Sequence, residues 1–134
     1  MSTSPQKIFT VSEARELLPE LRPRLHELRE IWTDLAPFQE EAQKISKRVE
    51  EGGATLPHAG EYFLLVHRLK KKMTYFEQTG IEIKDISSGL VDFPSLRGGR
   101  VVYLCWRMDE ETITHWHETN SGFAGRQPIE DPIP

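Results

Sequence analysis

The chain has 134 residues and a formal net charge of −4 at pH 7, and this length predicts a single domain, residues 1–134. The mild acidity argues against a general binder of nucleic-acid phosphates, which usually carries a clustered basic excess, and no apolar run is long enough to cross a membrane. The one cysteine, Cys105, cannot form an internal disulfide and residues 1–10 lack the apolar segment of a signal peptide, so we expect a cytoplasmic protein.

The first predicted element is a long helix. Apolar residues follow one another at alternating steps of three and four, which is a heptad pattern: Val11, Ala14, Leu18, Leu21, Leu25, Leu28, Trp32 and Leu35. Thr10 and Glu13 fit a capping box at its start. Pro19 predicts a bend or a restart of the helix, and Pro37 predicts a second break.

A second, shorter helix is predicted after Gly52 and Gly53, which we expect to end the first one. Its apolar series runs from Tyr62 to Phe76, and Gly80 ends it. This helix of about 20 residues would be roughly 30 Å long, against roughly 60 Å for an unbroken helix over 11–51. Either the prolines fold the long segment into two pieces, or its overhang packs on the C-terminal half or on a second copy.

Beyond Gly80 the hydrophobic period changes to two, which is typical of strands. The candidates are Ile81–Asp85, Gly89–Phe93, Arg100–Arg107 and Thr112–Glu118. Short connections between them predict antiparallel neighbours. We therefore expect an α+β fold: an antiparallel helical hairpin or three-helix layer over 10–80, packed on a small antiparallel sheet over 81–118. A closing tail completes the C-terminal part, 81–134.

The register of the last hairpin decides which side chains share a face. A tight turn centred on residues 109–110 would pair Leu104 with His115. In this register His115 and His117 share one face and Cys105 lies on the other, and a slip of one residue would reverse the faces. Both faces carry large apolar groups, so a second covering layer is expected: the tail, the overhanging helix or another subunit.

His115 and His117 form the first candidate site. Two residues apart on a strand, they point the same way with Cα atoms roughly 6.6 Å apart, a spacing that can chelate a divalent metal. A zinc centre needs three or four protein ligands, and Asp92 is the candidate for the third. The alternative is a pair of half-buried histidines bonded to carboxylates or to backbone, with Cys105 an inert buried thiol.

A glycine-rich stretch, residues 121–126, forms the second candidate site together with Arg100, Arg107 and Arg126. Glycines let backbone N–H groups approach an anion, and guanidinium groups match carboxylates and phosphates. Asp92 would complete this ligand-binding set. The alternative is a closing loop in which Arg126 pairs with Asp92 or Glu118.

Four motifs, residues 89–94 (GLVDFP), 104–107 (LCWR), 115–117 (HWH) and 122–128 (GFAGRQP), resemble those of a family of small bacterial proteins classed as a domain of unknown function. The opening segment, residues 9–19, resembles that family too, so the likeness covers essentially the whole chain. It implies a bacterial, cytoplasmic protein whose distinctive side chains gather in the C-terminal half. It implies no activity, substrate or catalytic residue.

Two functions follow as hypotheses. The first is a non-catalytic interaction protein that forms homo-oligomers, because the heptad pattern is longer than its internal partner and the sheet is apolar on both faces. The second is a protein that binds a divalent metal or a small anion at the sheet, through Asp92, His115, His117, Arg107 and Arg126. A metal-activated water would make that site hydrolytic.

Overall fold

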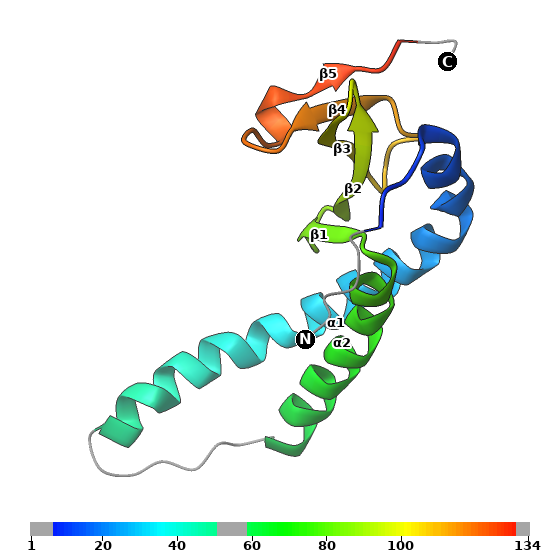
Figure 1. The fold of residues 1–134 in the computed structure, drawn as a ribbon. Helices are drawn as coiled ribbons and strands as arrows, with labels where there is room; N and C mark the ends of the chain where they lie inside the picture. The colour runs from blue at the N-terminus through cyan, green and yellow to red at the C-terminus, as the bar shows by residue number, and fades with distance from the viewer. Residues whose placement is uncertain (1–6, 51–58, 131–134) are drawn as a thin grey trace, which may run out of the picture.

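The computed structural model describes residues 7–50 and 59–130, in which two helices pack on one face of a five-stranded antiparallel sheet (Figure 1). The helices are α1 (Val11–Glu50) and α2 (Ala59–Thr79). The strands are β1 (Glu82–Asp85), β2 (Leu90–Arg97), β3 (Arg100–Arg107), β4 (His115–Glu118) and β5 (Gln127–Pro128), with a short 3₁₀ helix η1 (Phe123–Gly125) before the last. The sheet order follows the chain, and the α+β expectation with a helical hairpin is confirmed. Within the described residues, neither helix offers a stretch both long and apolar enough to cross a membrane.

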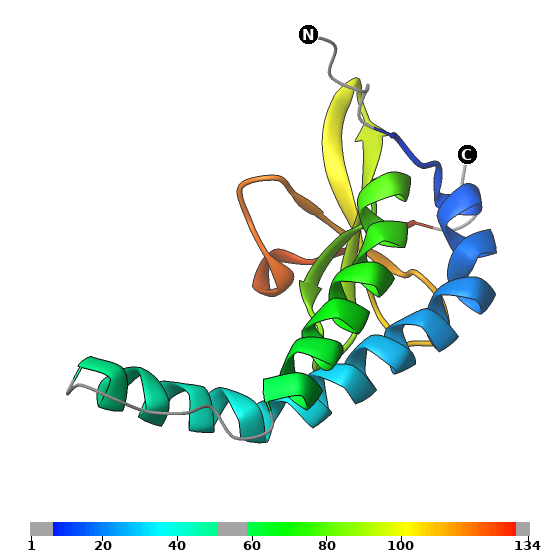
Figure 2. The ribbon, with the colours of Figure 1, turned by 90° about the horizontal axis from the view of Figure 1, so that it is seen from below.

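Helix α1 starts at the predicted capping box. The Thr10 N–H donates to Glu13 Oε1 at 2.8 Å, and the Glu13 N–H donates to Thr10 Oγ1 at 3.0 Å. The helix then continues through Pro19, Pro23 and Pro37, so the predicted restart and break are wrong; instead its axis curves (Figure 2). Each proline removes one backbone hydrogen bond of the helix. The packing of buried α1 side chains, which continue along the helix from Ala14 to Leu35, outweighs that loss.

The buried stripe of α1 follows the heptad pattern with one exception. Its core residues are Ala14, Leu18, Leu21, Leu25, Leu28, Ile31 and Leu35. Ile31 takes the buried place predicted for Trp32, which is exposed. The hydrophobic core that α1 shares with the sheet includes α1 residues up to Leu28. The longer helix therefore packs its first half on the sheet, which is one of the alternatives expected for its overhang. The predicted helix stop at residues 52–53 lies outside the described residues.

Two hairpin predictions need correction. Strand β2 runs through Pro94 to Arg97, because the chain reverses at Gly98 and Gly99, both with positive φ (59° and 79°), rather than in a wide loop over 94–99. Strand β4 begins at His115, not at Thr112. The C-terminal tail, predicted only to close over the sheet, also extends it by pairing β5 with β4.

The predicted register of β3 and β4 is wrong by one residue. Leu104 pairs with Trp116, and Cys105 pairs with His115. Trp116 therefore joins Leu104 on the face that α1 and α2 cover, while Cys105 shares the opposite face with the histidines. The cause is the connection between the strands, which spans residues 108–114 instead of forming a two-residue turn.

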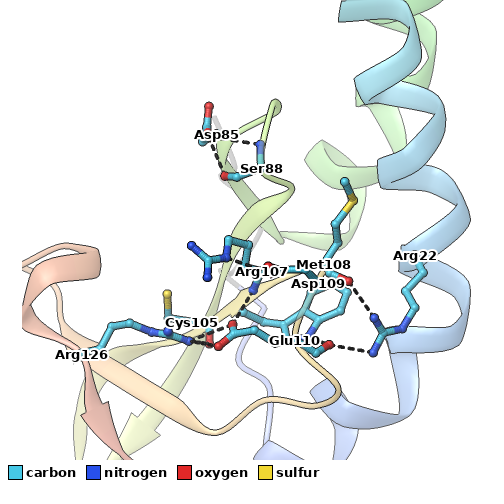
Figure 3. Close-up of polar contacts among 10 residues, drawn as sticks. Arg22, Asp85, Ser88, Cys105, Arg107, Met108, Asp109, Glu110 and Arg126 are labelled. Carbon is cyan, nitrogen blue, oxygen red and sulfur yellow. Dashed lines mark hydrogen bonds and ion pairs between the residues drawn. The ribbon is translucent and has the colours of Figure 1, made fainter. Parts of the chain in front are cut away.

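Side chains of α1 hold this connection in place. Arg22 donates hydrogen bonds to the carbonyls of Met108 and Glu110, at 2.7 and 2.9 Å (Figure 3), and to the Glu111 carbonyl at 2.6 Å. Arg15 donates to the Ile113 carbonyl. The Trp106 indole N–H also donates to the Glu110 carbonyl, and the Arg22 guanidinium lies 5.0 Å from the Trp106 ring centroid. The backbone groups that a tight turn would pair internally are thus satisfied by the helix.

We expect Arg22→Lys to lower the free energy of unfolding by about 1–3 kcal/mol, because one ammonium cannot reach three carbonyls and leaves partly buried acceptors unpaired. Urea unfolding followed by circular dichroism measures this. Arg29→Lys, on an exposed part of the same helix, is the matched control. Equal urea midpoints for wild type and Arg22→Lys would contradict the anchoring role.

Candidate functional site

The candidate site lies on the sheet face that the helices leave uncovered. Cross-strand pairing sets Glu82, Asp92, Cys105 and His115 in one row, from β1 to β4. The next row pairs Tyr103 with His117. Because directly paired residues of antiparallel strands point to the same side, the register alone brings two carboxylates, a thiol and two imidazoles to one face.

Three of these side chains form a compact cluster. Asp92, Cys105 and His117 are each buried, with 2%, 1% and 3% of their surface exposed. Their potential ligand atoms all lie within 4.8 Å of one another. The pattern of hydrophobic residues could have revealed Cys105, since placing Trp116 with Leu104 in the core forces the register that moves Cys105 beside His117.

The hydrogen bonds of His117 fix where its protons lie. Nδ1 is 2.8 Å from the Glu118 carbonyl oxygen, which can only accept, so Nδ1 carries a hydrogen. Nε2 is 3.0 Å from Asp92 Oδ2. This second contact also needs a proton, either on the imidazole or on the carboxyl group. The pair therefore shares one proton in the absence of a cation.

Burial disfavours charge in this cluster. It raises the pKa of Asp92, and the hydrogen bond and charge of His117 only partly oppose it. Burial and the neighbouring Asp92 charge raise the pKa of the Cys105 thiol to about 11. A nucleophilic cysteine needs a lowered pKa and a free base beside it, whereas here the thiol is protonated and His117 Nε2 is held by Asp92.

A cavity of about 210 Å³ opens next to the cluster. Besides the three clustered side chains, its lining consists of Lys84, Leu90, Tyr103, Thr119, Ser121, Gly122 and Phe123. The tail thus supplies the second covering layer that the apolar pattern predicted, on the side of the sheet away from α1 (Figure 2). Gly125 allows the tight loop there, since a Cβ at this position would come within 2.8 Å of the Ser121 side chain.

The rim of the cavity carries an ordered polar group. The Tyr103 hydroxyl donates to Glu82 Oε2 at 2.8 Å, and Lys84 Nζ donates to Glu82 Oε1 at 2.9 Å. Both contacts lower the pKa of Glu82, although its partial burial acts in the opposite direction. The hydrogen bond to Glu82 raises the pKa of Tyr103. Glu82 is therefore an anion at neutral pH. Among the residues that line the cavity, Lys84 carries the positive charge.

His115 lies outside the cluster. Its Nδ1 is 2.8 Å from Thr114 Oγ1, and the side chain is half-buried. The structure thus places one of the two predicted histidines, His117, with the predicted Asp92 and puts Cys105 where the sequence analysis had expected the second imidazole.

Two of the three predicted arginines lie on the same face, beside the cluster, and already have carboxylate partners; Arg126 also donates to the Cys105 carbonyl at 3.3 Å. Arg126 makes two 2.9 Å contacts to the Glu110 carboxylate, and Arg107 pairs with Asp109 at 2.8 Å (Figure 3). Both guanidinium groups lie over the Phe123 ring. The distance to the ring centroid is 4.5 Å for Arg126 and 5.2 Å for Arg107.

The partner predicted for Arg126 was wrong. It contacts neither Asp92 nor Glu118; instead Glu118 pairs with Arg100 at 2.6 Å. The reason is again the register, which pairs Glu118 with Val102 on the face opposite Cys105 and leaves Glu110, in the connection between β3 and β4, beside the tail.

Comparison with known proteins gives one match. Residues 7–129 match a protein family described as Uncharacterized conserved protein (DUF2203). The matched span includes both helices, all five strands and the three clustered side chains. No curated protein and no solved structure matches the chain.

We expect the metal-free wild-type protein to lose stability relative to Asp92→Asn as pH rises above 3.8, the ordinary Asp92 pKa. Since the folded state holds this proton more tightly than the unfolded state, the contribution is present at low pH and lost as pH rises through the raised pKa. Urea unfolding across this range, with a chelator present, measures it. Asp109→Asn, an exposed change of the same kind, is the control. Parallel profiles for wild type and Asp92→Asn would show that Asp92 titrates alike in both states.

Proposed function

The chain belongs to this DUF2203 family, whose description names no activity, and we propose that it binds a divalent metal through Asp92, Cys105 and His117. One observation carries the proposal: three different ligand types are buried together, and within the described residues Asp92 Oδ1 has no regular hydrogen bond, its carboxylate being contacted besides His117 by the weakly donating Cys105 thiol. Buried polar atoms are nearly always paired, and a cation would satisfy this oxygen.

The donor set fits zinc best. Zinc accepts thiolate, imidazole and carboxylate ligands in a tetrahedron, in which neighbouring donor atoms lie about 3.2–3.8 Å apart. The three donor atoms here are within 4.8 Å of one another, so modest side-chain movements would bring them to that geometry. The Nδ1 hydrogen bond of His117 to a backbone carbonyl also supports a metal role, since it leaves Nε2 to face the cation.

Metal binding would displace protons from the cluster. The Cys105 thiol must become a thiolate, and the proton between Asp92 and His117 must leave. The proposal includes the expected reducing cytoplasm, because such a compartment keeps the single cysteine available as a ligand.

A small anion is the ligand that we propose for the open side of the metal. Two anionic ligands neutralise a divalent cation, so the centre lowers the pKa of a bound water less than a centre with three neutral histidines would. We therefore propose binding without hydrolysis, and since the same neutralisation weakens the attraction of the metal for an anion, that binding depends on hydrogen bonds from the cavity lining. Lys84, Thr119 and Ser121 line the cavity and can donate hydrogen bonds to an anion that shares the metal. Arg107 and Arg126 remain with their carboxylate partners in this proposal.

The first prediction concerns metal content. We expect about one zinc ion per chain by elemental analysis, and Cys105→Ser, Asp92→Asn or His117→Gln to weaken zinc binding at least about 100-fold. Added zinc should raise the Tm of wild type, because it binds the folded state, and leave the variants unchanged. Cobalt(II) should give a thiolate charge-transfer band that Cys105→Ser abolishes.

His115→Gln is the matched control, because it removes an imidazole from the same strand face but outside the cluster. Full zinc affinity in Cys105→Ser, or a metal-free protein whose Tm ignores zinc and manganese, would refute the centre.

The second prediction concerns the anion. We expect phosphate or acetate to change the cobalt(II) spectrum, and Lys84→Ala to weaken that binding about 10-fold or more, since a hydrogen bond to a charged group contributes about 1.5–3 kcal/mol. Lys70→Ala, an exposed lysine on α2, is the control. A spectrum that neither anion alters would limit the proposal to metal binding.

A further inference from the structure

The end of the helical hairpin away from the sheet exposes large apolar side chains. Phe63 and Leu64 on α2 have 62% and 61% of their surface exposed, and Trp32 on α1 has 36%. Figures 1 and 2 show this part of the hairpin projecting past the sheet. Adjacent exposed apolar groups of this size mark a contact surface more often than a bare surface.

Trp32 continues a buried stripe. It follows Leu25 and Leu28 at helical spacing, so it lies on the helix face that covers the sheet. Beyond Leu28 the shared core with the sheet has ended, and α1 packs beside α2, as the contact between Phe38 and Tyr62 shows. Beyond Leu28 the buried stripe continues as Ile31 and Leu35, and Trp32 is left exposed on the sheet-facing side, past the end of the shared core.

The two helices of the projecting hairpin carry opposite charges. Exposed basic residues of α2 are Arg68, Lys70 and Lys71, with no acidic residue between Glu61 and Glu77. Exposed acidic residues of α1 in the facing range are Glu30, Asp34 and Glu40. Within one chain, Lys72 of α2 already pairs with Glu27 of α1 at 3.1 Å. The outer faces of the two helices thus carry the same kinds of charged group, lysine or arginine on α2 and carboxylate on α1, that pair between the helices within one chain.

We infer that this surface binds a second copy of the same chain, with α2 of each copy lying on α1 of the other. In a two-fold dimer one patch must be complementary to itself. The hairpin meets this condition because it presents a basic helix with Phe63 and Leu64 beside a mainly acidic helix, whereas an acidic or a basic foreign partner would match only one helix. Trp32 lies outside this patch, because a spacing of two residues puts it on the side of α1 opposite Glu30 and Asp34. A shallow hollow of about 310 Å³ on α1, lined by Arg29, Glu30, Thr33 and Asp34, would receive a basic side chain from α2 of the second copy, which would pair with the two carboxylates.

Sedimentation velocity of the full chain, from low to high micromolar concentration, tests this inference. We expect a reversible dimer in both metal-loaded and chelator-treated protein, because the hairpin surface is separate from the Asp92 cluster. Phe63→Glu with Leu64→Glu should raise the dimer dissociation constant at least about 100-fold, as expected for central apolar contacts. Leu96→Glu, an equally exposed leucine on the β2–β3 hairpin, should leave it unchanged.

A charge-reversal pair tests whether the contact runs between copies. One variant carries Lys70→Glu and Lys71→Glu, and the other carries Glu30→Lys and Asp34→Lys. Each alone should be monomeric, since like charges would face each other, and an equimolar mixture should form a heterodimer.

Three results would overturn the inference: a wild-type monomer at every concentration, no recovery of dimer in the mixture, or a Leu96→Glu effect equal to that of the Phe63 and Leu64 pair. Binding of monomeric wild type to anionic lipid vesicles would assign the surface to a membrane instead.

Discussion

The structure depends on how α1 holds the connection between β3 and β4. Arg22 and Arg15 satisfy carbonyls of residues 108–114 that lie more than 80 positions away in the sequence. This anchoring sets the length of the connection, the length sets the register of β4, and the register decides which face each side chain of β4 occupies. A residue outside the candidate site, on a helix whose described residues line no part of the cavity, thereby determines that His117 meets Cys105 and Asp92.

The sequence predicted the elements better than their pairing. The heptad pattern, the capping box and the period of two identified both helices and the four main strands, with β3 at its observed bounds. The register could not be read from local turn chemistry, because the partners of the connection's carbonyls lie on α1. Hydrophobic sorting held the missing information: the predicted register put Trp116 and Leu104 on opposite faces, whereas a shift of one residue buries both and keeps both histidines off the core face. The site prediction kept Asp92 and His117 and missed Cys105 for this reason.

Burying an acid, a thiol and an imidazole together opposes folding unless something compensates for their lost hydration. The Asp92–His117 hydrogen bond offsets part of this cost, and a cation would offset more. At the projecting end of the helical hairpin the free-energy cost has the opposite origin, because there large apolar side chains such as Phe63 and Leu64 are exposed to water. These two features explain why the polar cluster and the exposed patch lead to separate proposals, one for the uncovered sheet face and one for the helices.

Glu110 links three parts of the molecule, because its carbonyl accepts from Arg22 while its carboxylate holds both Arg126 and the Arg107 backbone. The tail beyond it adds only a two-residue strand to the sheet, whereas β2 and β3 are paired over eight residues. Displacing the tail from the sheet therefore breaks far fewer hydrogen bonds than separating β2 from β3. The cavity would open by movement of the tail, and the rate of that movement would set the rate at which a ligand enters or leaves. The ion pair between the Glu110 carboxylate and Arg126 would then set the residence time of a bound ion.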